Sequence, residues 1–341
     1  MGSKSKNIFR VVGLVVFFAL GITILNPYIA KIPESISAIQ SLDFGDLGLA
    51  VLCEFLRFLG YAVLINAVLG LFKDHVSIWL ALIIILASAS FGMIAGGMAG
   101  SIAASIQWLH ERKVKLQAAT VASILQNLLS NIAIFLLSLL GVAYLRSMDV
   151  LTKPQWNAVL IILCMLVVVL VFSGLFLTKR EKSIGFLISV IQWVSKILKK
   201  EIDEGKIREQ IGEVYEVWDV VLRKKWWRPL LGLSMSFLFD ILALYFFFLS
   251  AGQPLSFTTL IIGYGLPQLL GKAAFVLPGG IGVVESSMIG LYQKMGISSS
   301  VSVIVVLAYR LIAFIIPTLL GFLFVFSLQR VFHKKESVNL R

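Results

Sequence analysis

The chain has 341 residues, of which 59% are hydrophobic and 14% are charged, and its mean hydropathy is +0.94. This composition excludes an ordinary soluble domain and predicts an all-α integral membrane protein of the cell (cytoplasmic) membrane. The formal net charge is +12, but the basic residues are clustered. Such clustering favours an anionic membrane surface as the partner and argues against nucleic acid.

Six apolar segments are each long enough to cross a bilayer. The first follows Lys4, Lys6 and Arg10 but has no small-residue cleavage site, so we interpret it as a retained anchor and not as a signal peptide. In chain order, the predicted spans are 11–29, 47–72, 116–145, 156–178, 229–250 and 300–328.

Two further apolar regions are interrupted by residues that break helices. Glycines interrupt 77–108, whereas glycines, two prolines and Lys272 interrupt 257–294. If the first region crossed the membrane once and the second twice, the strongly basic segment 179–228 would face outside. That arrangement contradicts the positive-inside rule. We therefore predict two re-entrant helical hairpins, each of which enters and leaves the membrane on one side.

These elements form one polytopic membrane domain over 1–341, with both termini inside (N-in/C-in). Its halves, about 1–150 and 151–341, are predicted to be inverted repeats, a plan that recurs among transporters. In the segment 179–228, apolar residues recur at spacings of three to five with charges between them. This pattern predicts a cytoplasmic amphipathic helical segment.

Five ionisable residues stand out within the predicted membrane regions, where each must face protein, water or a partner. Glu54 and Arg57 are three residues apart on one helix face, and a structural ion pair explains them as well as a functional one. Lys272, Glu285 and Arg310 lie in or near the second hairpin. Lysine and arginine there are suited to bind a lipid phosphate. The alternative is a charge network that only holds the hairpin in place.

The most specific motif begins at Leu277 and reads Leu-Pro-Gly-Gly-Ile-Gly-Val-Val-Glu as far as Glu285. It is followed by Met-Gly-Ile at 295–297, Ala-Tyr-Arg-Leu at 308–311 and Pro-Thr-Leu-Leu-Gly at 317–321. In order and spacing this stretch resembles the membrane domain of lysylphosphatidylglycerol synthases, which also occurs alone in flippase-like proteins. The resemblance implies a protein that moves, or helps to move, a lipid with a polar headgroup between leaflets.

The chain departs from this family in its first half. The first hairpin lacks the proline and glutamate that are usual in the family, and Gln126 and Asn127 stand where charged residues are common. The soluble aminoacyl-transferring domain is also missing, so we expect no lipid aminoacylation by this chain alone. The residues expected to bind the lipid headgroup are Lys272, Pro278, Gly279, Gly280, Gly282, Glu285 and Arg310, with Glu54 and Arg57 as a secondary intramembrane pair.

The predicted function is flippase-like transport of an anionic phospholipid or a polyprenyl-phosphate-linked lipid between leaflets. The alternative is a non-catalytic membrane partner that recruits or positions a separate, soluble lipid-modifying transferase. We expect no enzyme activity, because the sequence holds no nucleophile, nucleotide or metal constellation, and we expect no catalytic residue, metal or cofactor. The sequence leaves open a homo-oligomer, the identity of the lipid, and the direction and energy source of transport.

Overall fold

The computed structural model describes residues 42–95, 97–147, 227–274 and 278–338, together with ten single positions between 153 and 189. The predicted span 11–29 lies outside the described residues. So do most of the predicted span 156–178 and most of the amphipathic segment 179–228.

The described chain is built from helices and short helical turns, several of which begin at a side-chain cap. The Asp43 carboxylate accepts from the amides of residues 45 and 46, and Ser77, Ser256 and Ser298 each cap a helix in the same way. The elements are α3 (Phe44–Leu69), η1 (Gly70–Phe72), α4 (Ile78–Gly92), α5 (Met98–Glu111), α6 (Leu116–Ser147), α10 (Trp227–Ser250), α11 (Phe257–Ala273), η2 (Pro278–Gly280), α12 (Val283–Lys294), α13 (Ser299–Arg310), η3 (Leu311–Ile315) and α14 (Ile316–Val338).

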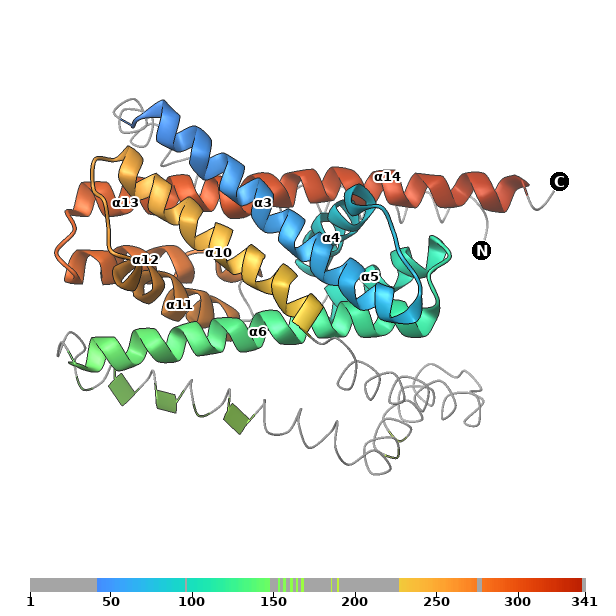
Figure 1. Cartoon of the computed structure of the whole chain (residues 1–341), viewed down its shortest axis with the longest axis horizontal. Helices are drawn as coiled ribbons and strands as arrows, with labels where there is room; N and C mark the ends of the chain where they lie inside the picture. Colours follow the sequence, from blue (N-terminus) through green and yellow to red (C-terminus); the bar gives the residue numbers. More distant parts are fainter. Residues whose placement is uncertain are drawn as a thin grey trace.

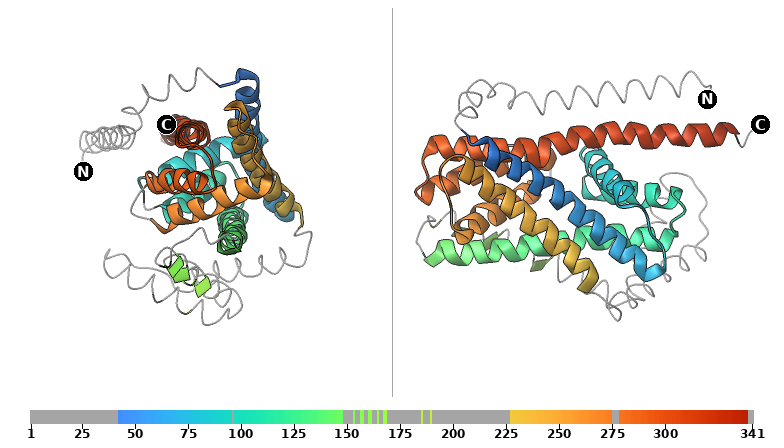
Figure 2. Two further views of the ribbon diagram at one scale, coloured as in Figure 1. Left: turned by 90° about the vertical axis from the view of Figure 1, so that its left-hand side faces the viewer. Right: turned by 45° about the horizontal axis from the view of Figure 1, so that its top comes forward.

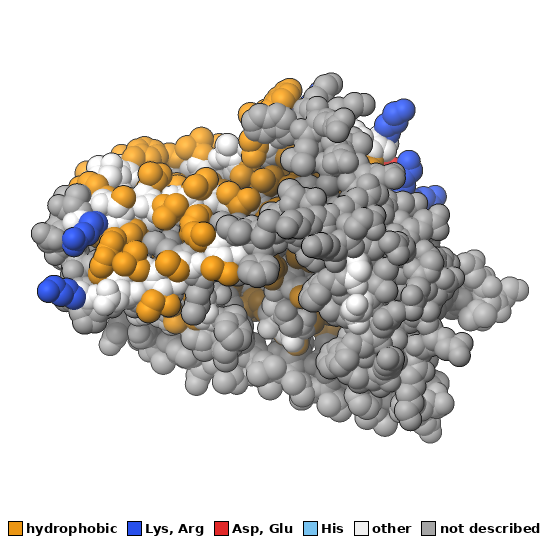
Figure 3. All heavy atoms as spheres, turned by 90° about the horizontal axis from the view of Figure 1, so that it is seen from below, with side chains coloured by type: hydrophobic (Ala, Val, Ile, Leu, Met, Phe, Trp, Pro, Cys, Tyr) orange, Lys and Arg blue, Asp and Glu red, His pale blue; other side chains and the backbone are white. Residues whose placement is uncertain are grey.

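Four segments are long and apolar enough to cross a membrane: Phe44–Phe72, Leu116–Arg146, Trp227–Ser250 and Ser299–Leu328. They confirm four of the six predicted spans to within three residues at each end. Their outward side chains are apolar, as Leu140 (62% exposed) and Leu323 (61% exposed) illustrate. In the view from below, apolar side chains cover much of the described surface and lysine and arginine lie at its two ends (Figure 3). This is the surface of a membrane protein.

The two regions predicted as hairpins each form a pair of short helices. α4 and α5 have 15 and 14 residues, and α11 and α12 have 17 and 12. At about 1.5 Å per residue, none reaches the ~30 Å thickness of a bilayer core. The α4/α5 pair and the α11/α12 pair lie at opposite ends of the bundle (Figure 1). The helix pairs therefore fit the predicted hairpins, while their insertion from opposite sides stays a prediction.

Helix contacts made by the first half of the chain have equivalent contacts made by the corresponding helices of the second half. α3 packs against α10, and α11 packs against α6 as α4 packs against α14. Two views show α6 and α14 running along opposite sides with α3 and α10 between them (Figures 1 and 2). Inverted repeats predict these equivalent contacts.

Small residues let the helices approach closely at these contacts. A Cβ at Gly60 of α3 would lie 2.7 Å from the backbone nitrogen of Ser236 in α10. Ser138 of α6 donates to the Gly265 carbonyl of α11 at 2.8 Å, and Ser90 of α4 donates to the Thr318 carbonyl of α14 at 2.9 Å. Glycine contacts with serine hydroxyls that bond across helices are typical of membrane helix packing.

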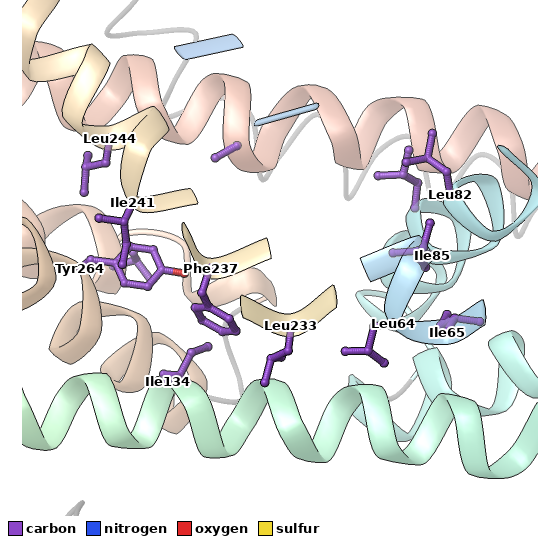
Figure 4. Packing of buried hydrophobic residues seen from close by; sticks show 14 of the residues in the cluster. Leu64, Ile65, Leu82, Ile85, Ile134, Leu233, Phe237, Ile241, Leu244 and Tyr264 are labelled. Atoms are coloured by element: carbon purple, nitrogen blue, oxygen red, sulfur yellow. The ribbon is translucent and has the colours of Figure 1, made fainter. Parts of the chain in front are cut away.

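Around these contacts the core is filled by aliphatic and aromatic side chains (Figure 4). The rings of Phe237 and Tyr264 meet edge to face, with 6.5 Å between their centroids. The packing of α10 against α11 in this way brings the polar end of Tyr264 to Asp240 of α10.

Candidate functional site

The Pro-Gly-Gly-Ile-Gly break adopts a backbone that only glycine tolerates readily. Gly279, Gly280 and Gly282 have φ values of 64°, 65° and 83°. A Cβ at Gly280 would also lie 2.5 Å from the Cα of Gly271, so the break packs directly on the end of α11. Pro278 opens this turn as the first residue of η2. The motif glycines thus build the turn between the two helices of the hairpin.

Glu285 and Arg310 hold this turn from two sides. Glu285 Oε2 accepts from the Gly282 amide at 2.6 Å, which caps α12, and Glu285 Oε1 pairs with Arg310 Nε at 2.5 Å. Arg310 also donates to the Gly279 carbonyl at 3.1 Å, and its guanidinium lies over the Phe314 ring. Both charged side chains are at least 90% buried. This ion pair, whose net charge is zero, therefore holds the last span against the hairpin turn.

The Lys272 side chain reaches α6. Its ammonium donates to Asn131 Oδ1 of α6 at 2.7 Å, and its side chain is exposed. The Asn131 amide in turn lies 3.5 Å from the sulfur of Met98, the first residue of α5. One side chain of α6 therefore touches an end of each hairpin, beside the break in each case.

The start of α5 differs from the start of α12. Gly97, with φ 66°, precedes α5 without any side-chain cap, and Met98 is 58% exposed. In α12 the amide of the N-cap residue Gly282 donates to Glu285, whereas the equivalent Gly97 amide before α5 donates to the Gly92 carbonyl at 2.7 Å. The N-terminus of α5 therefore has no carboxylate beside it, and the first amides of a helix with such an end can bind an anion.

A second polar cluster joins α3, α10 and the last span. Arg57 Nε lies 2.6 Å from Glu54 and its NH1 donates to Asp240 at 3.3 Å. Its NH2 donates to the Ala313 carbonyl at 2.6 Å. In an α-helix this carbonyl would accept from residue 317, but Pro317 has no amide hydrogen. The π-helix η3 lies at this point, and Arg57 supplies a donor to the carbonyl.

Three residues of this second cluster were not among the candidates from the sequence. Asp240 accepts hydrogen bonds from the hydroxyls of Tyr264 at 2.7 Å and Tyr309 at 2.6 Å. Asp240 is the single charged residue of the apolar segment 229–250, and that signal is visible in the sequence. The two tyrosines carry no such signal, because only packing shows which face of a helix meets Asp240.

The polar residues of both clusters lie near the middle of their spans. Arg57 is 13 residues from Phe44 and 15 from Phe72, and Asn131 is 15 residues from each end of Leu116–Arg146. Asp240 lies within Trp227–Ser250 and Arg310 within Ser299–Leu328, each at least 10 residues from the nearer end. Charge is most costly at the bilayer centre, so these residues mark a polar interior. Within the described part of the chain, no three His, Cys, Asp or Glu side chains group as metal ligands.

Comparison with known proteins gives a family match and several relatives. The sequence profile of the lysylphosphatidylglycerol synthase TM region matches residues 9–321. A UPF0104 membrane protein of Methanocaldococcus jannaschii is 31% identical over 159 residues, which are 45% of this chain and 47% of that protein. One of Pyrococcus horikoshii is 32% identical over 164 residues, with shares of 46% and 49%. The chain spans about half the length of the curated relatives it matches.

Proposed function

The chain belongs to the lysylphosphatidylglycerol synthase TM region family, and from this premise we propose that it is a flippase-like transporter. Its substrate would be a lipid with an anionic headgroup, either a phospholipid or a polyprenyl-phosphate-linked lipid. The acyl or prenyl chains stay in the bilayer while the headgroup passes through the polar interior of the bundle.

The contact of both hairpins with Asn131 carries this proposal. There, an exposed lysine ammonium and the N-terminus of α5 lie on either side of one amide, halfway along a membrane span. A phosphate that leaves water needs donors to replace its hydration. Lys272 has further N–H donors besides the one on Asn131, and the first amides of α5 add their aligned dipoles.

Arg310 has a different role in this proposal. Its charge is neutralised by Glu285, so it does not attract a phosphate in the described state. A phosphate that competes with Glu285 for Arg310 would open the ion pair and release the Gly279 and Gly282 contacts. Headgroup binding would in this way loosen the hairpin turn, which gives the lipid a path towards the other leaflet.

Reconstitution tests the proposal. Purified protein in vesicles that carry a trace of fluorescent phosphatidylglycerol should speed its exchange between leaflets, and should move the zwitterionic phosphatidylcholine analogue more slowly. No acceleration for any anionic lipid would contradict transport. Co-purification of a soluble transferase in that case would support the alternative, a membrane partner that positions a separate enzyme.

A further inference from the structure

The cluster around Arg57 holds more negative than positive charge. Glu54 and Asp240 are each 2% exposed, and both lie against the one guanidinium of Arg57. Among the residues that the structure describes, no second lysine or arginine pairs with either carboxylate. If all three groups were ionised, one uncompensated charge would be buried near the bilayer centre, at a large desolvation cost. The Glu285–Arg310 pair, with one charge of each sign, has no such excess.

The two carboxyl groups have different surroundings. Asp240 accepts three hydrogen bonds, from Arg57, Tyr264 and Tyr309, and these donors stabilise its ionised form. Neither oxygen of Glu54 accepts a hydrogen bond with acceptable geometry, although Arg57 Nε is only 2.6 Å away. A hydrogen on the carboxyl group that accepts no hydrogen bond removes the excess charge without breaking any bond to Asp240, and this carboxyl group is Glu54.

We propose that Glu54 is a proton-binding site, protonated while Asp240 stays ionised beside Arg57. The step is the dissociation of Glu54–COOH into Glu54–COO⁻ and H⁺, with no other bond changed. A metal cation at the same place would face the Arg57 guanidinium, which favours the proton as the ligand. The titratable and charged groups near Glu54 are Cys53, Arg57 and Tyr61 of α3, Asp240 of α10 and Tyr309 of α13, and Tyr264 of α11 lies behind them on Asp240.

Arg57 connects this proton to the hairpin turn. When the proton leaves, Glu54 becomes a second full charge beside Arg57 and competes with the Ala313 carbonyl for its donors. Ala313 lies three residues after Arg310, on the same continuous helical segment. Loss of the proton would therefore weaken the contact between α3 and the segment that carries Arg310. This link makes the proton a coupling ion, a role that rests on the proposed transport function.

Infrared difference spectroscopy tests the proton site without any transport. The purified wild-type protein at neutral pH should show the carbonyl band of one protonated carboxylic acid in an apolar setting. Glu54→Gln imitates the protonated side chain, so it should fold normally and lose this band. Glu111→Gln, at the end of α5, is the matched control and should keep it. A wild-type spectrum without the band, a band that survives in Glu54→Gln, or a Glu54→Gln protein that does not fold would overturn the proposal.

A second measurement tests the coupling. In the reconstituted vesicles, a pH gradient should change the wild-type rate of lipid exchange severalfold, and Glu54→Gln should move lipid at one rate whatever the gradient. Equal rates of lipid exchange by the wild type with and without the pH gradient would overturn the coupling. If the infrared band behaves as expected but no lipid moves in any vesicle, the proton site stands and the transport function fails.

Discussion

Arg57 and Arg310 are both placed near the middle of a span, yet their charges are balanced differently. Arg310 faces one carboxylate and the Gly279 carbonyl, so removal of the Glu285 charge leaves a buried cation. Arg57 faces two carboxyl groups, and with a proton on Glu54 it forms a neutral pair with Asp240 that Glu54→Gln leaves in place. The same chemical change, glutamate to glutamine, is therefore expected to destabilise the protein at position 285 and to change its stability little at position 54.

Glu285→Gln should lower the free energy of unfolding by about 3–5 kcal/mol, because an uncompensated charge is then buried. The glutamine oxygen can still accept from the Gly282 amide, so the helix cap is kept. The loss in free energy of unfolding therefore comes from the removed charge. The measurement is the unfolding midpoint in detergent. Glu54→Gln is the control and should shift the midpoint little. Equal losses in the two variants would contradict this difference in charge balance.

The sequence indicates part of the site but not its partners. Glu285, Arg310 and the glycines are recognisable as a motif, and the structure brings them together around one turn. The sequence places Lys272 in the same hairpin as Glu285, but it does not indicate that the Lys272 ammonium contacts Asn131 of α6. Residues on one hairpin are constrained by the chain, but contacts between the hairpin and a distant helix depend on packing. For the same reason the tyrosines that bind Asp240 could not be predicted.

The hairpin turn shows at the scale of an element why glycine is required at particular places. Gly280 combines a positive φ with a close approach to the backbone of Gly271. Gly290 lies within α12, and a Cβ added there would meet no atom of a neighbouring element within 4 Å. Because the two glycines are in one hairpin, comparing substitutions at each shows whether glycine is required at this turn in particular.

Gly280→Ala should reduce the amount of folded protein strongly, since a left-handed alanine costs about 1–2 kcal/mol before any collision with the backbone is counted. Gly290→Ala should be neutral or should stabilise the helix by roughly 0.5–1 kcal/mol. Size-exclusion profiles and unfolding midpoints in detergent compare the two variants. Tolerance of alanine at position 280 would show that the turn has another conformation in the folded protein.

Most elements could be predicted from the sequence, because the length of an apolar run decides whether it spans a membrane. The four confirmed spans illustrate this, and the glycine-rich regions were correctly expected to be split into shorter helices. The π-helix η3 was not expected. It interrupts the last span just before Pro317, where the regular hydrogen-bond pattern fails and Arg57 reaches the Ala313 carbonyl.

At the scale of the whole molecule, the helix contacts made by one half of the chain recur in the other half. α4/α5 packs on α14 and α6 as α11/α12 packs on α6 and α13, with the α3–α10 contact between the halves. The hairpins lie at opposite ends (Figure 1), which fits the insertion from opposite sides that the charge pattern of the sequence predicts. The charge pattern does not show which helices meet.

Labelling tests this topology. In a variant with Cys53→Ser and Cys164→Ser, single cysteines introduced by Lys115→Cys and Ser300→Cys should react with a membrane-impermeant reagent from opposite sides. Both positions are exposed, and each lies a few residues after the last helix of a hairpin. Reaction of both from the same side would refute the two re-entrant hairpins.

The most direct test of the transport claim is the rate of phosphatidylglycerol exchange in vesicles that contain Lys272→Gln. A glutamine amide at this position can still donate to Asn131, and the unfolding midpoint in detergent checks that the variant is folded. We predict an exchange at least severalfold slower than in the wild type, while Lys294→Gln, at the other end of the same hairpin, keeps the wild-type rate. Equal rates in the wild type and Lys272→Gln would contradict a headgroup site between the hairpins.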